Sequence, residues 1–366
     1  MFVPVHKGAN APARQRGVKV YAGMDPRLPL DATAAHARRV ERLGYDGLQV
    51  PETVHDAMAV ATLIAEHTER ITVRTSVALA FVRSPVLLAY SAWDLAKFSG
   101  GRFELGLGTQ IRQNIEERYG VPFGDHPVAR LRDYLGAVRA AFQAFRSGEP
   151  PRYDSPAYRV TRMQPYFNPG PDDSTDPPLI YLGGVQRPTC ELAGELADGF
   201  ITHPTNANPR YLQERCLPAL ADGARATGRD LRADRFEVVI GTPIVTGGSQ
   251  AAVDAERERQ RRLLAFLYST PSYRPTLELY GWDDLGPKLR YLIRRERWDD
   301  LGSVLSDDVM DTLVPCARFS ELARVLAERF AGLGQGIVVS PPPHLDDDNA
   351  FAEVIAELRQ AGETSA

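Results

Sequence analysis

The sequence is poor in cysteine and lacks long apolar runs. Its 366 residues include three cysteines, Cys190, Cys216 and Cys316, which lie far apart and lack the spacing of metal ligands. A disulfide-stabilised secreted fold is therefore disfavoured, and we expect reduced thiols in a cytoplasmic protein. No apolar run approaches the roughly 18 residues that a membrane-spanning helix needs. Residues 1–17 carry basic side chains but no apolar stretch typical of a secretory signal, and we expect a flexible leader there.

The net charge is also small. It is −4, with 25% charged and 43% hydrophobic residues. So slight an acidity disfavours nucleic acid or another polyanion as a partner. The composition is that of an ordinary soluble enzyme, and the length allows either one large α/β barrel or two to three smaller domains.

Motifs of several enzyme classes are absent as well. The chain contains no Gly-x-Ser-x-Gly nucleophile elbow and no cluster with the spacing of a metal site. Residues 106–111, GLGTQI, lack the third glycine of a dinucleotide-binding fingerprint. These absences favour chemistry on a bound organic cofactor over chemistry on a protein nucleophile or a metal ion.

The most informative stretch that is present is 98–114, FSGGRFELGLGTQIRQN. Its glycine pair predicts the end of a helix, and a short apolar strand follows at 103–107. Polar side chains then begin at Thr109. Ligands of α/β proteins bind at the carboxyl ends of strands, so this arrangement predicts a ligand contact. A tight strand-to-helix turn without function is the alternative interpretation.

The same joint, in which a helix ends near a glycine and a short apolar strand follows, recurs along the chain. It appears at 41–50, 98–107, 192–202 and 328–340. Repeated joints of this kind predict βα units around a parallel sheet. The expected strands are 18–24, 47–52, 71–80, 103–107, 179–184, 199–204, 236–245 and 336–342. Eight of them predict a (β/α)8 barrel, a single domain over 18–362 with insertions near 150–178 and 268–312. An open doubly wound sheet is the alternative.

If the barrel is correct, the active site is built from the residues that follow each strand. Those residues are Met24, Asp25, Glu52, His55, Ser76 to Ala80, Thr109, Gln110, Gly183 to Gln186, His203, Thr242, Ser340 and His344.

Several of these segments carry a resemblance to a known family. The segments 44–52 (GYDGLQVPE), 75–79 (TSVAL), 101–110 (GRFELGLGTQ) and 179–200 resemble the bacterial luciferase-like oxidoreductases, which use a flavin or a deazaflavin. Residues 108–120 and 163–171 are most similar to the subgroup that uses coenzyme F420.

The resemblance implies a barrel of the luciferase-like type that holds an isoalloxazine or deazaflavin ring at its mouth. In deazaflavin members the third strand bulges at a cis peptide against the ring, and Ser76–Val77, followed by Ala78, matches that position. Thr109 and Gln110 match the family's polar end of the fourth strand, which touches the ring or its ribityl chain. An ordinary strand is the alternative interpretation of the segment around Ser76.

A phosphate site has a separate physical basis. Gly183 and Gly184 precede a predicted helix, whose first N–H groups lack partners and attract anions. Val185 and Gln186 would add donors, as would Thr189. A plain strand-to-helix turn is again the alternative.

The expected acid–base residues are Glu52, His55 and His203. The family places an acidic residue where Glu52 stands, near the polar edge of the ring, although a solvated carboxylate without a role would look the same. The two histidines are candidate proton donors, and a lone histidine is more often structural. Sugar-phosphate dehydrogenases of the family have histidine where this chain has Thr53 and glutamate where it has Ile111. Both departures argue against that activity.

The resemblance therefore implies an F420-dependent oxidoreductase. We expect hydride transfer between the deazaflavin and a small organic substrate, by C=C or C=N reduction or by alcohol oxidation. The alternatives are an FMN-dependent monooxygenase and a non-catalytic flavin-binding barrel. We expect both insertions to cover the mouth and to select the substrate, the second through Tyr268, Tyr273, Tyr280 and Trp282. Packing of these aromatic residues within the insertion itself is the alternative. We also expect a homodimer.

Overall fold

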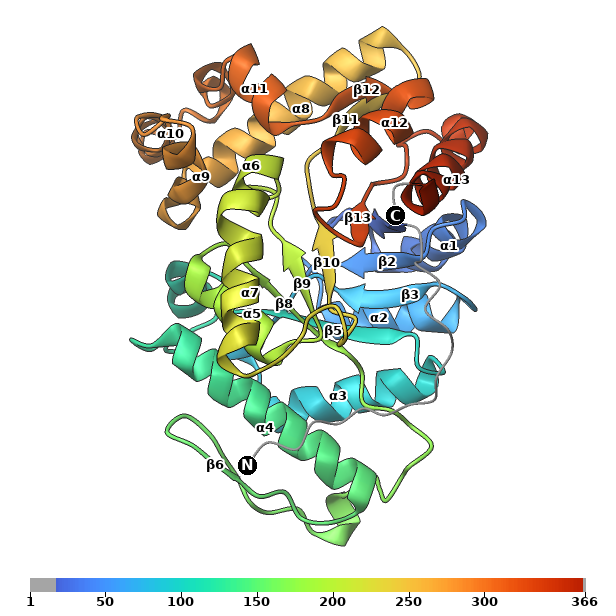
Figure 1. The fold of residues 1–366 in the computed structure, drawn as a ribbon, viewed down its shortest axis with the longest axis vertical. Coiled ribbons are helices and arrows are strands. Elements are labelled where there is room, and N and C mark those ends of the chain that lie inside the picture. The colour runs from blue at the N-terminus through green and yellow to red at the C-terminus, as the bar shows by residue number, and fades with distance from the viewer. Residues whose placement is uncertain (1–17, 365–366) are drawn as a thin grey trace.

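Eight parallel strands close into a barrel in the computed structural model, which describes residues 18–364 (Figure 1). The barrel strands are β1 (Lys19–Gly23), β2 (Gly47–Val50), β3 (Thr72–Thr75), β5 (Phe103–Gly108), β8 (Ile180–Gly184), β9 (Gly199–Thr202), β10 (Glu237–Ile240) and β13 (Gly336–Val338). They follow the order β3-β2-β1-β13-β10-β9-β8-β5, and a pairing of β3 with β5 closes the ring. The predicted barrel is confirmed and the open sheet is wrong. The expected leader, residues 1–17, lies outside the described residues.

Two predicted strands are divided in the structure. The expected strand 71–80 consists of β3 and β4 (Ala78–Leu79), separated by a cis peptide bond between Ser76 and Val77. Both pieces pair with β5. The expected strand 236–245 contributes only β10 to the barrel. Its last residue begins β11 (Val245–Gly247), which pairs outside the barrel with β12 (Cys316–Arg318).

Helices surround the barrel and connect its strands (Figure 1). They are α1 (Leu30–Arg42), α2 (Ala57–Glu66), α3 (Pro85–Phe98), α4 (Pro127–Ser147), α5 (Arg187–Leu196), α6 (Pro209–Tyr211), which continues through the π-helix η4 (Leu212–Cys216) into α7 (Leu217–Ala226), α12 (Phe319–Arg329) and α13 (Asp348–Thr364). One main core joins their inner faces to the outward side chains of the strands. None of the helices in residues 18–364 combines the length and the apolar character needed to cross a bilayer.

In three of the four recurring joints, the glycine at the end of the helix has the left-handed backbone that the sequence predicts. Gly44, Gly100 and Gly332 have φ angles of 88°, 64° and 73°, a left-handed conformation that glycine adopts without a side-chain penalty. At the third joint Gly194 lies inside α5 instead. A Cβ atom there would stand 1.9 Å from the carbonyl oxygen of Leu220, so that glycine lets α5 approach α7 closely.

A helical insertion lies between β11 and β12 and has a core of its own. It contains α8 (Gln250–Tyr268), α9 (Arg274–Leu279), α10 (Leu285–Arg294) and α11 (Asp307–Leu313), with short 3-10 turns at Pro271–Tyr273, Trp298–Asp300 and Gly302–Val304. In Figure 1 these helices occupy the top of the view, whereas α3 and α4 lie at the bottom. We call residues 248–315 the helical insertion.

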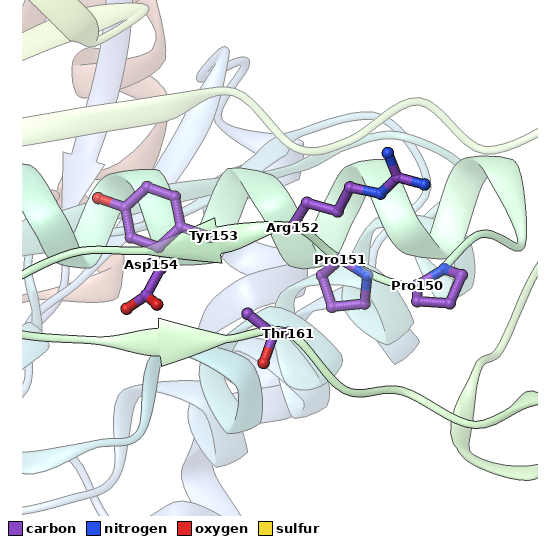
Figure 2. A pocket seen from close by; sticks show the side chains of 6 residues that line it. All are labelled: Pro150, Pro151, Arg152, Tyr153, Asp154 and Thr161. Atoms are coloured by element: carbon purple, nitrogen blue, oxygen red, sulfur yellow. The ribbon is translucent and has the colours of Figure 1, made fainter.

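The proline-rich excursion forms a short antiparallel hairpin of β6 (Tyr153–Asp154) and β7 (Arg159–Val160). It lies along α4, where the hydroxyl of Tyr158 accepts a hydrogen bond from Arg130 at 3.2 Å. The carbonyl oxygen of Phe167 accepts one from Tyr90 on α3 at 2.5 Å. The expectation that this excursion covers the mouth is therefore wrong, because it packs on the outer helices. A hollow of about 390 Å³ on this hairpin is lined by Pro150, Pro151, Arg152, Tyr153, Asp154 and Thr161 (Figure 2).

Candidate functional site

The residues predicted to form the site gather at one end of the barrel. All eight barrel strands are parallel, so their carboxyl ends lie on the same side. Glu52, Ser76, Thr109, Gly183 and His203 each stand at or just after such an end. We call this end the mouth. The structure therefore brings together residues that are up to 151 positions apart in the sequence, as Glu52 and His203 are.

Val77 forms part of the wall of the mouth. A Cβ atom on Gly108 would stand 2.6 Å from one of its methyl carbons, and a Cβ atom on Gly183 would stand 2.8 Å from the other. No real side chain tolerates such contacts, so the side chain of Val77 occupies the space that these two glycines leave. Gly108 and Gly183 therefore accommodate Val77.

Glu52 is held by an arginine that the sequence analysis missed. Its Oε2 atom accepts hydrogen bonds from the backbone N–H of Leu79 at 2.6 Å and from Nη1 of Arg83 at 2.7 Å. Arg83 forms a second ion pair with Asp56, whose side chain caps the start of α2. Burial lowers the pKa of Arg83, but the hydrogen bonds and charges of Glu52 and Asp56 outweigh that effect and raise it. Glu52 therefore ties β4 to the mouth, a structural task that the sequence did not indicate.

His55 lies beside this cluster in an open hollow of about 400 Å³. The hollow is lined by Glu52, Thr53, Val54, His55, Asp56, Val82, Arg83, Tyr119 and Val121. Its lining combines charged side chains, such as Glu52 and Arg83, with apolar ones, such as Val82 and Val121. His55 therefore lies beside Glu52 and Arg83 in the lining of this hollow.

His203 is oriented from two sides. Its Nδ1 atom lies 3.3 Å from the backbone N–H of Thr205, which donates to it, and its ring stacks on Tyr273 at 4.4 Å between centroids. Nδ1 also lies 2.9 Å from the hydroxyl oxygen of Thr205, and when it accepts from both groups of Thr205 the neutral ring carries its proton on Nε2. Burial lowers the pKa of His203 to about 4. The imidazole is neutral at pH 7, and a neutral ring with Nε2–H can donate a hydrogen bond at the mouth.

We expect this depressed pKa to make the fold sensitive to acid. The ordinary pKa of histidine is 6.5, so between pH 6.5 and about 4 the unfolded chain binds a proton that the folded chain does not. Stability is therefore lost as the pH falls through that window, by roughly 1–2 kcal/mol between pH 7 and 5. The variant His203→Asn keeps an acceptor for Thr205 but cannot titrate. In urea unfolding, this variant should lose less stability between pH 7 and 5 than the wild type does. His126→Asn, at an exposed position, should lose as much as the wild type.

Tyr273 reaches His203 because the helical insertion is anchored on the loop after β9. The hydroxyls of Tyr268 and Thr276 both donate to the carbonyl oxygen of Thr205, at 3.0 and 2.6 Å. Tyr268 is 1% exposed and belongs to the core of the insertion, so the expectation that it selects substrate is wrong. The ring of Tyr280 stacks on Trp282 at 4.8 Å. Among the four aromatic residues that we singled out, Tyr273 is the one that contacts a predicted site residue.

The loop after β8 is fixed by its carbonyl groups. The carbonyl oxygen of Gly184 accepts a hydrogen bond from Asn206 at 3.1 Å, and that of Val185 accepts one from Tyr211 at 3.1 Å. The next residue, Gln186, is the N-cap of α5. The loop therefore leads directly into the amino end of a helix, where backbone N–H groups favour an anion.

Gln110 has an unusual backbone for a residue with a side chain. Its φ angle is 61°, and its own side-chain oxygen accepts a hydrogen bond from the N–H of Ile111 at 3.0 Å. Non-glycine residues in the left-handed region are uncommon and concentrate at functional sites. The chain enters the π-helix η2 (Asn114–Arg118) four residues later. The strained turn sets the direction in which the chain leaves the mouth.

A buried ionic cluster forms the floor beneath the mouth. Arg74 is fully buried, and its guanidinium lies between the rings of Tyr21 and Tyr181, at 4.4 and 3.8 Å from their centroids. It pairs with Glu104 and Glu237, and both tyrosine hydroxyls donate to Glu237. Burial alone would lower the pKa of Arg74, but the nearby acids and tyrosines have the larger effect, so its pKa is raised overall. The sequence analysis missed this cluster, although charged residues inside apolar strands are a readable signal.

Comparison with known proteins identifies the family. Residues 2–335 match the model of the family described as luciferase-like monooxygenase. The chain belongs to this family. It is 36% identical to an uncharacterised protein of Mycobacterium tuberculosis. The alignment spans 318 residues and covers 87% of this chain and 92% of that protein. It is 28% identical to an F420-dependent glucose-6-phosphate dehydrogenase of Nakamurella multipartita, over 70% of both chains.

A solved structure supports the same fold. The coenzyme F420-dependent tetrahydromethanopterin reductase of Methanopyrus kandleri superposes with a TM-score of 0.78 over 94% of this chain and 99% of that chain, at 19% identity. Relatives of this luciferase-like protein therefore include F420-dependent oxidoreductases. The specific roles of Glu52, His55 and His203 stay predictions.

Proposed function

We propose that the protein is an F420-dependent oxidoreductase that transfers hydride between the deazaflavin and a small organic substrate. F420-dependent relatives at 28% and 19% identity support the coenzyme. The observation that carries the proposal is the mouth itself, where a fixed loop before α5 can receive a phosphate and the wall at Val77 can support a ring. When bound, the deazaflavin supplies two-electron hydride chemistry. FMN is the alternative cofactor, and it would make the protein a monooxygenase.

The side chains at the mouth suit proton transfer more than nucleophilic attack. His203 is neutral and is held by Thr205 and Tyr273, so that Nε2–H is its available donor. His55 lies in the open hollow on the Glu52 side. The imidazole of His55 can exchange a proton with a substrate oxygen or nitrogen, whereas the neutral ring of His203 can donate a hydrogen bond to it from Nε2. Carbonyl, alkene or imine reduction, or the reverse alcohol oxidation, requires one such proton for each hydride.

We expect Gln186→Glu to weaken F420 binding about tenfold, because a carboxylate at the amino end of α5 repels a phosphate. Gln186 is exposed, so the substitution leaves the core intact. Fluorescence titration should be carried out with F420, with its phosphate-free deazaflavin riboside and with FMN.

The riboside should bind wild type and variant equally, and Gln250→Glu, at the exposed start of α8, should bind F420 like the wild type. Equal loss of F420 and riboside would contradict the phosphate assignment. Tighter binding of FMN than of F420 by the wild-type protein would overturn the proposed coenzyme.

A further inference from the structure

The open hollow that contains His55 lies where neighbouring barrel strands end. Its lining comes from the loop after β2, from the turn after β4 and from the segment that follows η2. The strands β2, β3 and β5 are adjacent in the barrel, and β4 pairs with β5. Leu79, whose N–H donates to Glu52, stands two residues from Val77 in the wall of the mouth. A volume of about 400 Å³ accommodates a small molecule, which would lie next to that wall.

Among the residues that line the hollow, Arg83 has the one guanidinium, and two carboxylates occupy it. Nη1 of Arg83 donates to Glu52 at 2.7 Å, and Nη2 donates to Glu52 and to Asp56. Asp56 also accepts from the N–H groups of Met58 and Ala59, at 2.9 and 3.0 Å, so its carboxylate fills the amino end of α2. An anionic ligand would therefore have to displace a carboxylate to reach either kind of donor.

The charges around the hollow have the same sign. The lining itself contributes two carboxylates against one guanidinium. Residues 112–125, which include Tyr119 and Val121 of the lining, contain three acids against two arginines. Arg130 on α4 does not line the hollow, and it donates to the carbonyl oxygen of Phe123 at 3.1 Å. The local excess of negative charge attracts a cation and repels an anion.

The accessible part of the lining combines a carboxylate with apolar side chains. The side chain of Asp56 is 52% exposed, whereas that of Glu52 is 7% exposed, so a ligand meets Asp56 first. Val54 is 65% exposed, and Tyr119 and Val121 are half-buried. The face of an aromatic ring such as that of Tyr119 also attracts a cation. The lining therefore suits a positive charge on an apolar body.

We propose that the substrate is an apolar cation, an iminium that the enzyme reduces to an amine. This inference rests on the proposed function, which supplies the reduced deazaflavin. Hydride from the reduced coenzyme forms a C–H bond at the iminium carbon, and the electron pair of the C=N double bond moves onto nitrogen, which becomes a neutral amine. Loss of the hydride, and then of a proton to solvent, oxidises the coenzyme by two electrons. Among the reactions considered above, C=N reduction is thereby selected.

The proposal agrees with the departure from the family pattern at Ile111. An iminium already carries the positive charge that a carbonyl group gains only when an acid donates to it. Hydride addition to an iminium therefore requires no proton from the protein. Ile111 stands where sugar-phosphate dehydrogenases of the family have glutamate. In this assignment Asp56 contributes to binding of the cation and transfers no proton.

The test compares three ligands of similar size by isothermal titration calorimetry on the full chain without coenzyme. They are N-methyl-3,4-dihydroisoquinolinium, which is a permanent iminium, the neutral ketone 1-tetralone and the anion 1-naphthoate. We expect the wild-type protein to bind the iminium about tenfold more tightly than the ketone, and the naphthoate most weakly. Asp56→Asn retains a good N-cap residue but removes the charge, so it should reduce the preference for the iminium to about threefold or less.

Two further variants complete the comparison. Asp284→Asn is the matched control, because Asp284 also stands at the N-cap of a helix, α10, and pairs with a base, Lys288, but belongs to the helical insertion. It should retain the wild-type preference. Val54→Lys places a cation in the hollow at an exposed position and should abolish the preference for the iminium. Because this substitution leaves the core intact, it tests the hollow even if Asp56→Asn fails to fold.

The outcomes separate the charge of the substrate from the choice of coenzyme. No measurable binding of the iminium, or binding no tighter than that of the ketone or the naphthoate, overturns the cationic substrate. An undiminished preference in Val54→Lys overturns the assignment to this hollow. With reduced F420, the wild type should oxidise the coenzyme with the iminium, and turnover of the ketone alone would overturn C=N reduction. If F420 does not bind, the proposed function falls, whereas calorimetry without coenzyme still decides the charge of the ligand.

Discussion

Replacement of Arg74 by methionine is expected to lower the free energy of unfolding by about 3–5 kcal/mol. The guanidinium is fully buried and pairs with Glu104 and Glu237, whose side chains are 13% and 7% exposed. Removal of the cation leaves these two acids facing each other in the barrel with little water to solvate them. Lys19 reaches Glu237 at 3.2 Å and compensates only in part, because it is 36% exposed.

Urea unfolding followed by circular dichroism measures this effect. Arg324→Met is a matched control, because Arg324 forms an exposed pair with Glu328 and its loss should change stability by less than about 0.5 kcal/mol. Addition of Glu104→Gln and Glu237→Gln to Arg74→Met should restore part of the loss, since the uncompensated charges are then gone. A destabilisation below 1 kcal/mol for Arg74→Met would show that the acids are solvated and that the barrel floor is not dry.

Gly106→Ala should be as damaging despite adding a single methyl group. A Cβ atom at that position would stand 1.9 Å from the carbonyl oxygen of Thr75 and 3.0 Å from its carbonyl carbon. These atoms belong to the backbone of β3, which pairs with β5 to close the barrel, and they cannot rotate away. Thr75 is further tied to Gly106 by two hydrogen bonds of its hydroxyl, at 2.8 and 2.9 Å. We expect a loss of about 3 kcal/mol or more, or no folded protein.

The comparison is with Gly286→Ala in α10. A Cβ atom there would meet its nearest neighbours at 3.5 Å and beyond, which is ordinary contact. Alanine favours the helix over glycine by about 1 kcal/mol, so this variant should be more stable than the wild type. The two alanine variants should therefore shift the thermal midpoint in opposite directions. If Gly106→Ala leaves the stability of the protein unchanged, β3 and β5 can separate locally without loss of folding free energy.

The arrangement of the barrel was predictable from short segments. Glycines after helices and the apolar runs that follow them are local features, and they located four barrel strands, including β5 at Phe103–Gly108, whereas apolar runs alone located the other four. The errors occurred where local signals were ambiguous. The apolar run 236–245 continues through Val245, but that residue belongs to β11, because the chain leaves the barrel to pair with β12.

The sequence by itself determined which residues stand at the mouth. Parallel strands with connecting helices must place their carboxyl ends on one side, so the order of strands and loops was sufficient to bring Glu52, Ser76, Thr109, Gly183 and His203 together. Family membership then followed from the same segments.

Only the tertiary structure decided what those residues contact. Arg83 on Glu52, Tyr273 on His203 and Val77 between Gly108 and Gly183 are pairings across different strands and loops. The depressed pKa of His203 depends on burial by segments far away in the chain. A residue pattern carries no record of such contacts, because distance and solvent exclusion arise only when the barrel closes.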